Sequence, residues 1–178
     1  MRLAALGVLV AAVLLSGCAN LKHQEATVHD GDLRLSGRLS VQVSGDETRK
    51  GTGGTAAFEL AGGPAAGQLE LSTPLGSLVA RANWSDRQVV LRTPDGERSF
   101  DDLDSLTREM LGEPIPVAAL FDWLQGRAWP QAASVPVEGG FEQLGWRIDL
   151  SRFPDGLLVA TRSAAPTVTL RARLEKNT

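Results

Sequence analysis

One stretch of the sequence decides the fold: LRLSGRLSVQV, at residues 33–43, alternates between two kinds of residue along its whole length. Its odd positions hold small or apolar residues, and its even positions hold charged or polar ones. Successive side chains of a β-strand point to opposite faces, so this period of two predicts a strand with one buried face. We therefore expect this strand to belong to a sheet that covers an apolar core.

The same alternation recurs along the chain and is interrupted once. We predict further strands at 55–60, 68–72, 77–84, 88–93, 97–100, 144–150, 157–161 and 167–174, and a glycine-rich hairpin end at 44–54. Apolar residues fall at helical spacing at 102–111, before Gly112, and again at 117–124. A sheet of this many strands must curve, split or close to hide its apolar face and its edges. We therefore predict a mainly β fold, in which a curved antiparallel sheet carries two inserted helices across its open side.

Residues 1–17 have the composition of an export signal. A positive charge at Arg2 precedes an apolar run, and small residues precede Cys18. The sequence Leu15-Ser16-Gly17-Cys18 resembles the lipobox of bacterial lipoproteins, in which the cysteine is acylated and becomes the first mature residue. The alternative is that Cys18 is a buried core thiol, which requires the leader to be part of the fold. We predict a lipoprotein signal peptide at 1–17, an acylated amino terminus and tether at 18–31, and a single domain at 32–178.

The composition argues against catalysis and against nucleic-acid binding. The formal net charge is −3, and charges of both signs are interspersed without a basic cluster. His23 and His29 are the only histidines and both fall in the tether, so a metal site or a Ser-His-Asp triad lacks suitable residues. Asp101, Asp102 and Asp104 lie at the start of a predicted helix, whose amino end favours acidic residues. We expect no enzyme activity, no metal and no cofactor other than a covalent acyl anchor.

Five short motifs together resemble the LolB family of outer-membrane lipoprotein receptors. In chain order they are SGRLSV at 36–41, LELSTPLGS at 69–77, LGEPIP at 111–116, WLQG at 123–126 and QLGW at 143–146. The resemblance implies a monomeric half-barrel with a helical lid over an apolar cavity. It also implies a LolA-like periplasmic carrier and acylated lipoprotein cargo, which passes into the inner leaflet of the outer membrane. Ala19 replaces the aspartate that usually marks inner-membrane retention, so the resemblance favours an outer-membrane anchor facing the periplasm.

The resemblance also assigns roles to particular residues. Pro74, Leu75 and Gly76 match a protruding loop that delivers cargo into the membrane, with Leu75 at its tip. From the pattern alone, Leu75 could instead fold back over the apolar face of the sheet. Alternating strand faces and helical stripes nominate a cavity lining, which consists of Phe58, Leu69, Leu71, Trp84, Leu120, Trp123 and Trp146. Strand patterns do not distinguish a hollow interior from a solid core, so the same residues could fill a core instead.

Two other functions compete with the receptor. A scaffolding lipoprotein of the cell envelope would bind other envelope proteins through its sheet and would take up no acyl chains. An anchored hydrolase is disfavoured, because the chain lacks a suitably placed histidine and a reactive cysteine.

Overall fold

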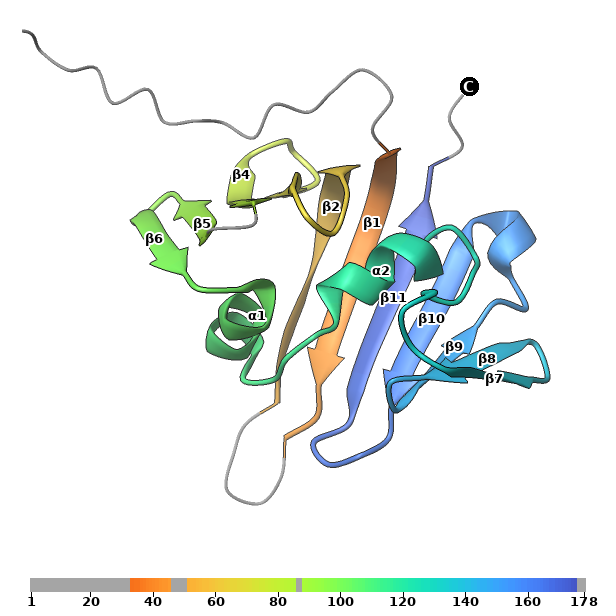
Figure 1. Ribbon diagram of the computed structural model, residues 1–178. Coiled ribbons are helices and arrows are strands. Elements are labelled where there is room, and N and C mark those ends of the chain that lie inside the picture. The colour runs from red at the N-terminus through yellow and green to blue at the C-terminus, as the bar shows by residue number, and fades with distance from the viewer. Residues whose placement is uncertain (1–32, 46–50, 86–87, 176–178) are drawn as a thin grey trace, which may run out of the picture.

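The computed structural model describes residues 33–45, 51–85 and 88–175. In these residues eleven strands form one open antiparallel sheet; the second of two α-helices crosses in front of the central strands, and the first lies beside them, toward one edge of the sheet (Figure 1). The strand order is β6-β5-β4-β3-β2-β1-β11-β10-β9-β8-β7, so the sheet has its edges at β6 and β7. The prediction of a mainly β fold with two inserted helices is confirmed.

Six strands precede the helices. They are β1 (Leu33–Val43), β2 (Thr52–Gly62), β3 (Gly67–Ser72), β4 (Leu78–Ser85), β5 (Gln88–Thr93) and β6 (Gly96–Phe100). Those that follow the helices are β7 (Ser134–Val137), β8 (Gly140–Gln143), β9 (Trp146–Asp149), β10 (Leu157–Arg162) and β11 (Val168–Leu174), with a short 3-10 helix at Phe153–Asp155. β1 joins the two sets, because it pairs with β2 on one side and with β11 on the other.

The structure differs from the prediction in three places. β2 begins at Thr52, so the glycines at 53–54 pair with β1 and do not form a hairpin end. The hairpin of β7 and β8 was not predicted, because both strands are only four residues long. Leu144 is not in a strand: it forms a turn with Gly145 between β8 and β9, and both residues have positive φ. The last error arises because a leucine fits the apolar alternation whether it lies in a turn or in a strand.

The helix α1 (Leu103–Leu111) is closed by local signals at both ends. Asp102 accepts a hydrogen bond from the Ser105 backbone N–H at 2.6 Å, which caps the first turn. Gly112 adopts the left-handed conformation, with a φ of 78°, and its N–H donates to the Arg108 carbonyl. The acidic residues before this helix thus include its N-cap. The second helix, α2 (Val117–Trp123), follows Pro116 and has no side-chain cap.

The core lies between α2 and the face of the sheet that α2 covers, here called the inner face. Alternate strand residues supply it, among them Phe58 and Leu60 of β2, and Leu158 and Ala160 of β10. Gly67 is needed on β3, because a Cβ there would come within 2.6 Å of the Trp84 ring. The other, outer face carries the polar members of each alternation. The strand at 33–43 is therefore half-buried, as its sequence predicts.

Candidate functional site

Aromatic side chains from the sheet and from α2 meet on the inner face. The Trp84 ring meets Phe121 edge-on, with centroids 5.9 Å apart. The Trp123 ring, which is completely buried, lies 6.0 Å from the ring of Trp146. Each pair joins α2 to a strand, and the two strands, β4 and β9, lie on opposite sides of the sheet centre. α2 therefore spans the inner face between the two halves of the sheet.

A buried amide fixes the chain beyond α2. Gln143, only 2% exposed, accepts hydrogen bonds through Oε1 from the Trp123 indole N–H and the Trp129 backbone N–H. Its Nε2 group donates to the carbonyls of Trp129 and Ala132. All four bonds are 2.8 or 2.9 Å long. Gln143 was not predicted to be buried. Had the register of β8 been known, its position beside the inward-facing Phe141 and Trp146 would have shown that Gln143 also faces inward.

The seven residues nominated as a cavity lining all lie in or against one apolar cluster. Four are buried in it, namely Phe58, Trp84, Trp123 and Trp146. The other three, Leu69, Leu71 and Leu120, are partly buried and pack against it. The structure thus brings together side chains from β2, β3, β4, β9 and α2. In this structure these side chains pack against one another as part of the apolar core.

The link between the helices is attached to the sheet by an ion pair. The Arg162 guanidinium donates to the Glu113 carboxylate at 2.7 Å, and both side chains are less than one-fifth exposed. The guanidinium carbon also lies 5.8 Å from the centroid of the Trp146 ring. Glu113 precedes α2 by four residues, so this contact holds the helical segment against β10.

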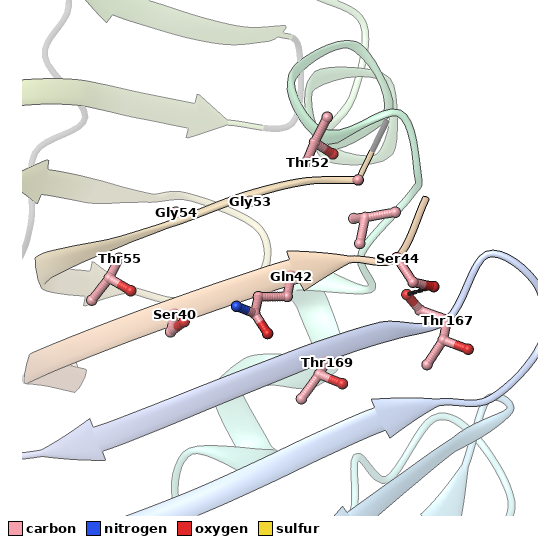
Figure 2. A pocket seen from close by; sticks show the side chains of 11 residues that line it. Ser40, Gln42, Ser44, Thr52, Gly53, Gly54, Thr55, Thr167 and Thr169 are labelled. Atoms are coloured by element: carbon pink, nitrogen blue, oxygen red, sulfur yellow. Dashed lines mark hydrogen bonds between the residues drawn. The ribbon is translucent and has the colours of Figure 1, made fainter. Parts of the chain in front are cut away.

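Two open cavities border the described residues. The first, of about 490 Å³, lies on the outer face between β2, β1 and β11, and its lining includes Ser40, Gln42, Thr55 and Thr169 (Figure 2). Its described lining contains no titratable side chain. The second, of about 440 Å³, lies beside the β8–β9 turn and is bordered by Val135, Leu144 and Trp146, among others. Only Trp146, of the seven nominated residues, borders either cavity.

The described residues contain no group of three or more metal-ligating side chains. Hydrogen bonds from Ser105 lower the pKa of the Asp102 carboxyl, and hydrogen bonds from Ser151 lower that of Asp149. Both carboxylates are acceptors in local turns, and neither borders the cavities described above. Asp102 acts as a helix cap, so its acidity has a structural cause.

Comparison with known proteins decides the family. The family described as "Outer membrane lipoprotein LolB" matches residues 32–174. This chain belongs to the LolB family. The relative from Bordetella petrii is 34% identical over 84% of this chain and 80% of its own length. The relative from Chromobacterium violaceum is 34% identical over 81% of this chain and 80% of its own length. The relative from Ralstonia nicotianae is 31% identical over 85% of this chain and 79% of its own length. All three are named outer-membrane lipoprotein LolB.

The β3–β4 turn of this LolB-family chain holds a leucine away from the protein. The Gly76 N–H donates to the Thr73 carbonyl at 2.9 Å, which closes the four-residue turn predicted from Pro74 and Gly76. The Ser77 N–H donates to the Thr73 hydroxyl at 3.1 Å. Leu75 is 95% exposed at the tip. The alternative in which Leu75 folds back over the sheet is therefore wrong.

The amino-terminal part of the LolB-family chain lies outside the described residues. Cys18, His23 and His29 fall there, as do the residues predicted to form the signal peptide and the tether. Among the described residues, neither α1 nor α2 has the length and hydropathy of a membrane-spanning helix.

Proposed function

We propose that this protein is a lipid-anchored receptor of the outer membrane. It accepts acylated lipoproteins from a LolA-like periplasmic carrier and inserts them into the inner leaflet, as a monomer and without covalent chemistry. The observation that carries the proposal is the family match over residues 32–174, with relatives named outer-membrane lipoprotein LolB. No nucleic acid, metal or cofactor takes part.

The sheet and helices would act as a half-barrel with a helical lid. The seven nominated residues, together on the inner face, support an apolar lining for the acyl chains of the cargo. Each CH₂ group exposed to water costs about 0.8 kcal/mol, so sheltering the chains is the physical task of a carrier or receptor. The interior opens when α1 and α2 move from the inner face. Release then requires only that the bilayer bind the chains better than the lining does.

Anchoring is assigned to Cys18, the first residue after the predicted signal peptide. A single acyl chain gives only marginal membrane binding, whereas several chains together hold a protein durably. Residues 18–31 then form the acylated terminus and the tether, and the domain at 32–178 works within reach of the membrane. A Cys18→Ala protein, exported by a substitute signal, is expected to accept cargo still, because acceptance depends on the lining.

Delivery is assigned to the turn of Pro74, Leu75 and Gly76. A leucine that is 95% exposed has little stabilising role in the folded domain, so its apolar surface is available to a membrane. The short turn is closed by backbone hydrogen bonds, which support a fixed tip. Leu75 would enter the bilayer interface and bring the mouth of the half-barrel to the lipid.

The test is a transfer assay with the mature protein in phospholipid vesicles. A soluble carrier loaded with an acylated lipoprotein is added, and cargo is followed from the carrier fraction to the receptor and then into the bilayer. We expect transfer that vesicles without the protein do not support. Cargo with brominated acyl chains should also quench tryptophan fluorescence if Trp84, Trp123 and Trp146 line the cavity. A carrier that stays loaded here, yet unloads onto another acceptor, would favour the scaffolding lipoprotein.

The Leu75→Glu protein separates acceptance from insertion. It should fold and accept cargo normally, because Leu75 has no buried surface to lose, but insertion should slow by about tenfold or more, the equivalent of ~1.4 kcal/mol. Leu75→Met keeps an apolar tip and is the matched control. Normal insertion by the glutamate protein would remove the delivery role.

A further inference from the structure

Arginines on the outer face of the sheet fall into two groups, which differ in what lies opposite them. In three pairs of neighbouring strands an arginine faces a glutamate and forms an ion pair with it: Arg81 with Glu70, Arg92 with Glu97, and Arg147 with Glu142. Where β1 pairs with β11, by contrast, Arg38 faces Arg173. Like charges directly opposite each other destabilise a sheet, so folding does not explain this pair.

Two more arginines extend the pair. Arg171 lies on the same face of β11, two residues before Arg173 and diagonal to Arg38, and Arg34 lies four residues before Arg38 on β1. Residues two apart along a strand are separated by about 6.6 Å, and diagonal neighbours by about 7–8 Å. The side chains of Arg38, Arg171 and Arg173 can therefore converge on one anion. We call the four residues the arginine cluster.

The arginine cluster is exposed and is not neutralised by its neighbours. All four side chains are exposed, and none forms an ion pair with another residue that the structure describes. Two carboxylates lie beside Ser36, between Arg34 and Arg38: Glu59 faces Ser36 from β2, and Glu175 accepts a hydrogen bond from the Ser36 hydroxyl at 3.2 Å. Four positive charges thus meet two negative ones, in a protein whose formal net charge is −3.

The outer-face cavity borders the arginine cluster (Figure 2). Ser40, on the cavity lining, faces Arg171, and Thr169 lies two residues before Arg171 on β11. The side chains of Ser40, Gln42, Thr55 and Thr169 make no hydrogen bond to any other described residue. Their hydroxyl and amide groups can donate to the phosphate and ester oxygens of a lipid headgroup. The described lining also holds no carboxylate that would repel a phosphate.

We propose that the arginine cluster and this polar cavity bind the phosphate headgroups of anionic lipids in the membrane that carries the protein. Guanidinium groups bind phosphate through paired, charge-assisted hydrogen bonds. The relatives of this LolB-family chain are named outer-membrane lipoproteins, so a bilayer lies beside the domain. The inference rests on the proposed function, because it assumes that Cys18 carries the anchor.

The position of the arginine cluster favours a membrane over an acidic protein. Arg34 is the second residue of β1 and follows Cys18 by 16 positions, so at most about 58 Å of chain joins them at ~3.6 Å per residue. Linkage of this kind raises the effective concentration of headgroups to the order of mM, so weak contacts become occupied. A carrier that delivers acyl chains to the inner face would dock on the other side of the sheet.

The first test measures how the mature-length Cys18→Ala protein, which has no acyl anchor, sediments with vesicles at low ionic strength. We expect binding to phosphatidylglycerol vesicles but not to phosphatidylcholine vesicles, and weaker binding as salt is added. Arg173→Gln should weaken binding about fivefold, and Arg38→Gln with Arg173→Gln about 25-fold, because each basic residue near an anionic surface contributes a factor of about five. Arg92→Gln, which removes a paired arginine from the same face, is the matched control and should weaken binding less than twofold.

Thermal unfolding of the same variants separates a binding role from a structural one. Arg173→Gln should unfold at the wild-type temperature or higher, because it removes the charge that faces Arg38. Arg92→Gln should unfold at the wild-type temperature or lower, because it removes an ion pair. A clear fall in the unfolding temperature of Arg173→Gln would show that this arginine stabilises the sheet, and would overturn the proposal.

The second test uses the acylated protein in vesicles of phosphatidylethanolamine and phosphatidylglycerol. A fluorophore is placed at Val159→Cys, on the outer face opposite Arg171, or at Asp104→Cys on α1, and energy transfer to headgroup-labelled lipid is measured. The introduced cysteine is the one labelled, since Cys18 is the only natural cysteine and its sulfur is acylated. Transfer should be stronger at position 159 than at position 104, and the difference should disappear in the Arg38→Gln and Arg173→Gln double variant.

Other outcomes overturn the inference in distinguishable ways. Absence of binding to anionic vesicles, or equal weakening by Arg173→Gln and Arg92→Gln, removes the lipid site and leaves the receptor intact, because cargo transfer is measured separately. A label at position 159 that responds to soluble carrier but not to vesicles would assign the arginine cluster to an acidic protein surface. Failure of cargo transfer by the unmodified protein would instead refute the proposed function.

Discussion

The two helices of the protein are held in place by different means. α2 buries five of its seven residues and has no side-chain cap at its start. α1 buries only Leu106 of its nine residues, but it is capped by Asp102 and ends at a left-handed glycine. α1 is therefore specified mainly by local sequence signals, whereas α2 is specified by packing against the sheet. We therefore expect substitutions of buried side chains to destabilise α2 most, and substitutions at the caps to affect α1.

The two helices also differ in how they are attached to the sheet. α1 is fastened to β2 by the bond from the Thr52 hydroxyl to Leu111, and to β6 by the exposed ion pair of Arg98 with Glu109. Exposed ion pairs contribute little free energy. α2 is fastened by buried aromatic contacts and by the Gln143 amide. α1 is therefore the more weakly attached of the two helices, and mutations that weaken each helix separately test this difference.

The largest effect is expected at Trp123 in α2. Trp123→Ala removes a completely buried ring and leaves a cavity beside Trp146, so the free energy of unfolding should fall by about 3–5 kcal/mol. Urea unfolding followed by far-ultraviolet circular dichroism measures the change. Leu106→Ala, which removes the buried residue of α1, should cost about 2–3 kcal/mol, at the lower end of the range for leucine. Equal losses would contradict the difference between the helices.

The next largest loss of stability is expected at Gln143. Gln143→Leu leaves the Trp123 indole N–H, the Trp129 N–H and two carbonyls without their partners, so we expect a loss of about 2–4 kcal/mol. Gln125→Leu, which removes an amide bonded to the Phe121 carbonyl, is the matched control and should cost about 1 kcal/mol. Gln125 also accepts a bond from the Arg127 guanidinium, which is exposed, so similar losses in the two proteins would show that the buried network of Gln143 contributes no more than these local bonds.

Sequence analysis predicted what local patterns encode and missed what distant contacts decide. The half-buried strand at 33–43, the capped α1 and the closed turn around Leu75 all follow from spacing, proline, glycine or a capping aspartate. Gln143 did not, because a polar residue in a strand is expected to face water until its register is known. Leu144 was assigned to a strand because it fits the apolar alternation. Its positive φ belongs to the turn that it forms with Gly145, and leucine gives no sign of such a turn in the sequence. The pairing of Glu113 with Arg162 joins residues far apart in the sequence, which no local pattern reveals.

A smaller loss of stability is expected at Glu113, which attaches the link between the helices to β10. Glu113→Gln removes the charge that faces Arg162 and should cost about 2 kcal/mol, between the values for exposed and fully buried pairs. Glu109→Gln weakens the exposed pair of α1 with Arg98 and should cost less than about 1 kcal/mol. Unfolding at low and high salt separates the two, because the exposed pair is screened more strongly. An equal salt dependence would contradict the assigned difference in burial.

The smallest effect is expected at the cap of α1. Asp102→Ala removes the acceptor for the Ser105 N–H and should cost about 1 kcal/mol at pH 7. Hydrogen bonding from Ser105 lowers the pKa of the folded Asp102 carboxyl below the ordinary value of 3.8, so the unfolded chain binds this proton more tightly. The charged cap is therefore fully stabilising above that ordinary value, and its advantage disappears as the pH falls through the lowered one. Asp102→Asn retains a neutral acceptor and should lose this pH dependence. If the alanine and wild-type proteins differ equally at pH 7 and at acid pH, the cap acts through its shape and not through its charge.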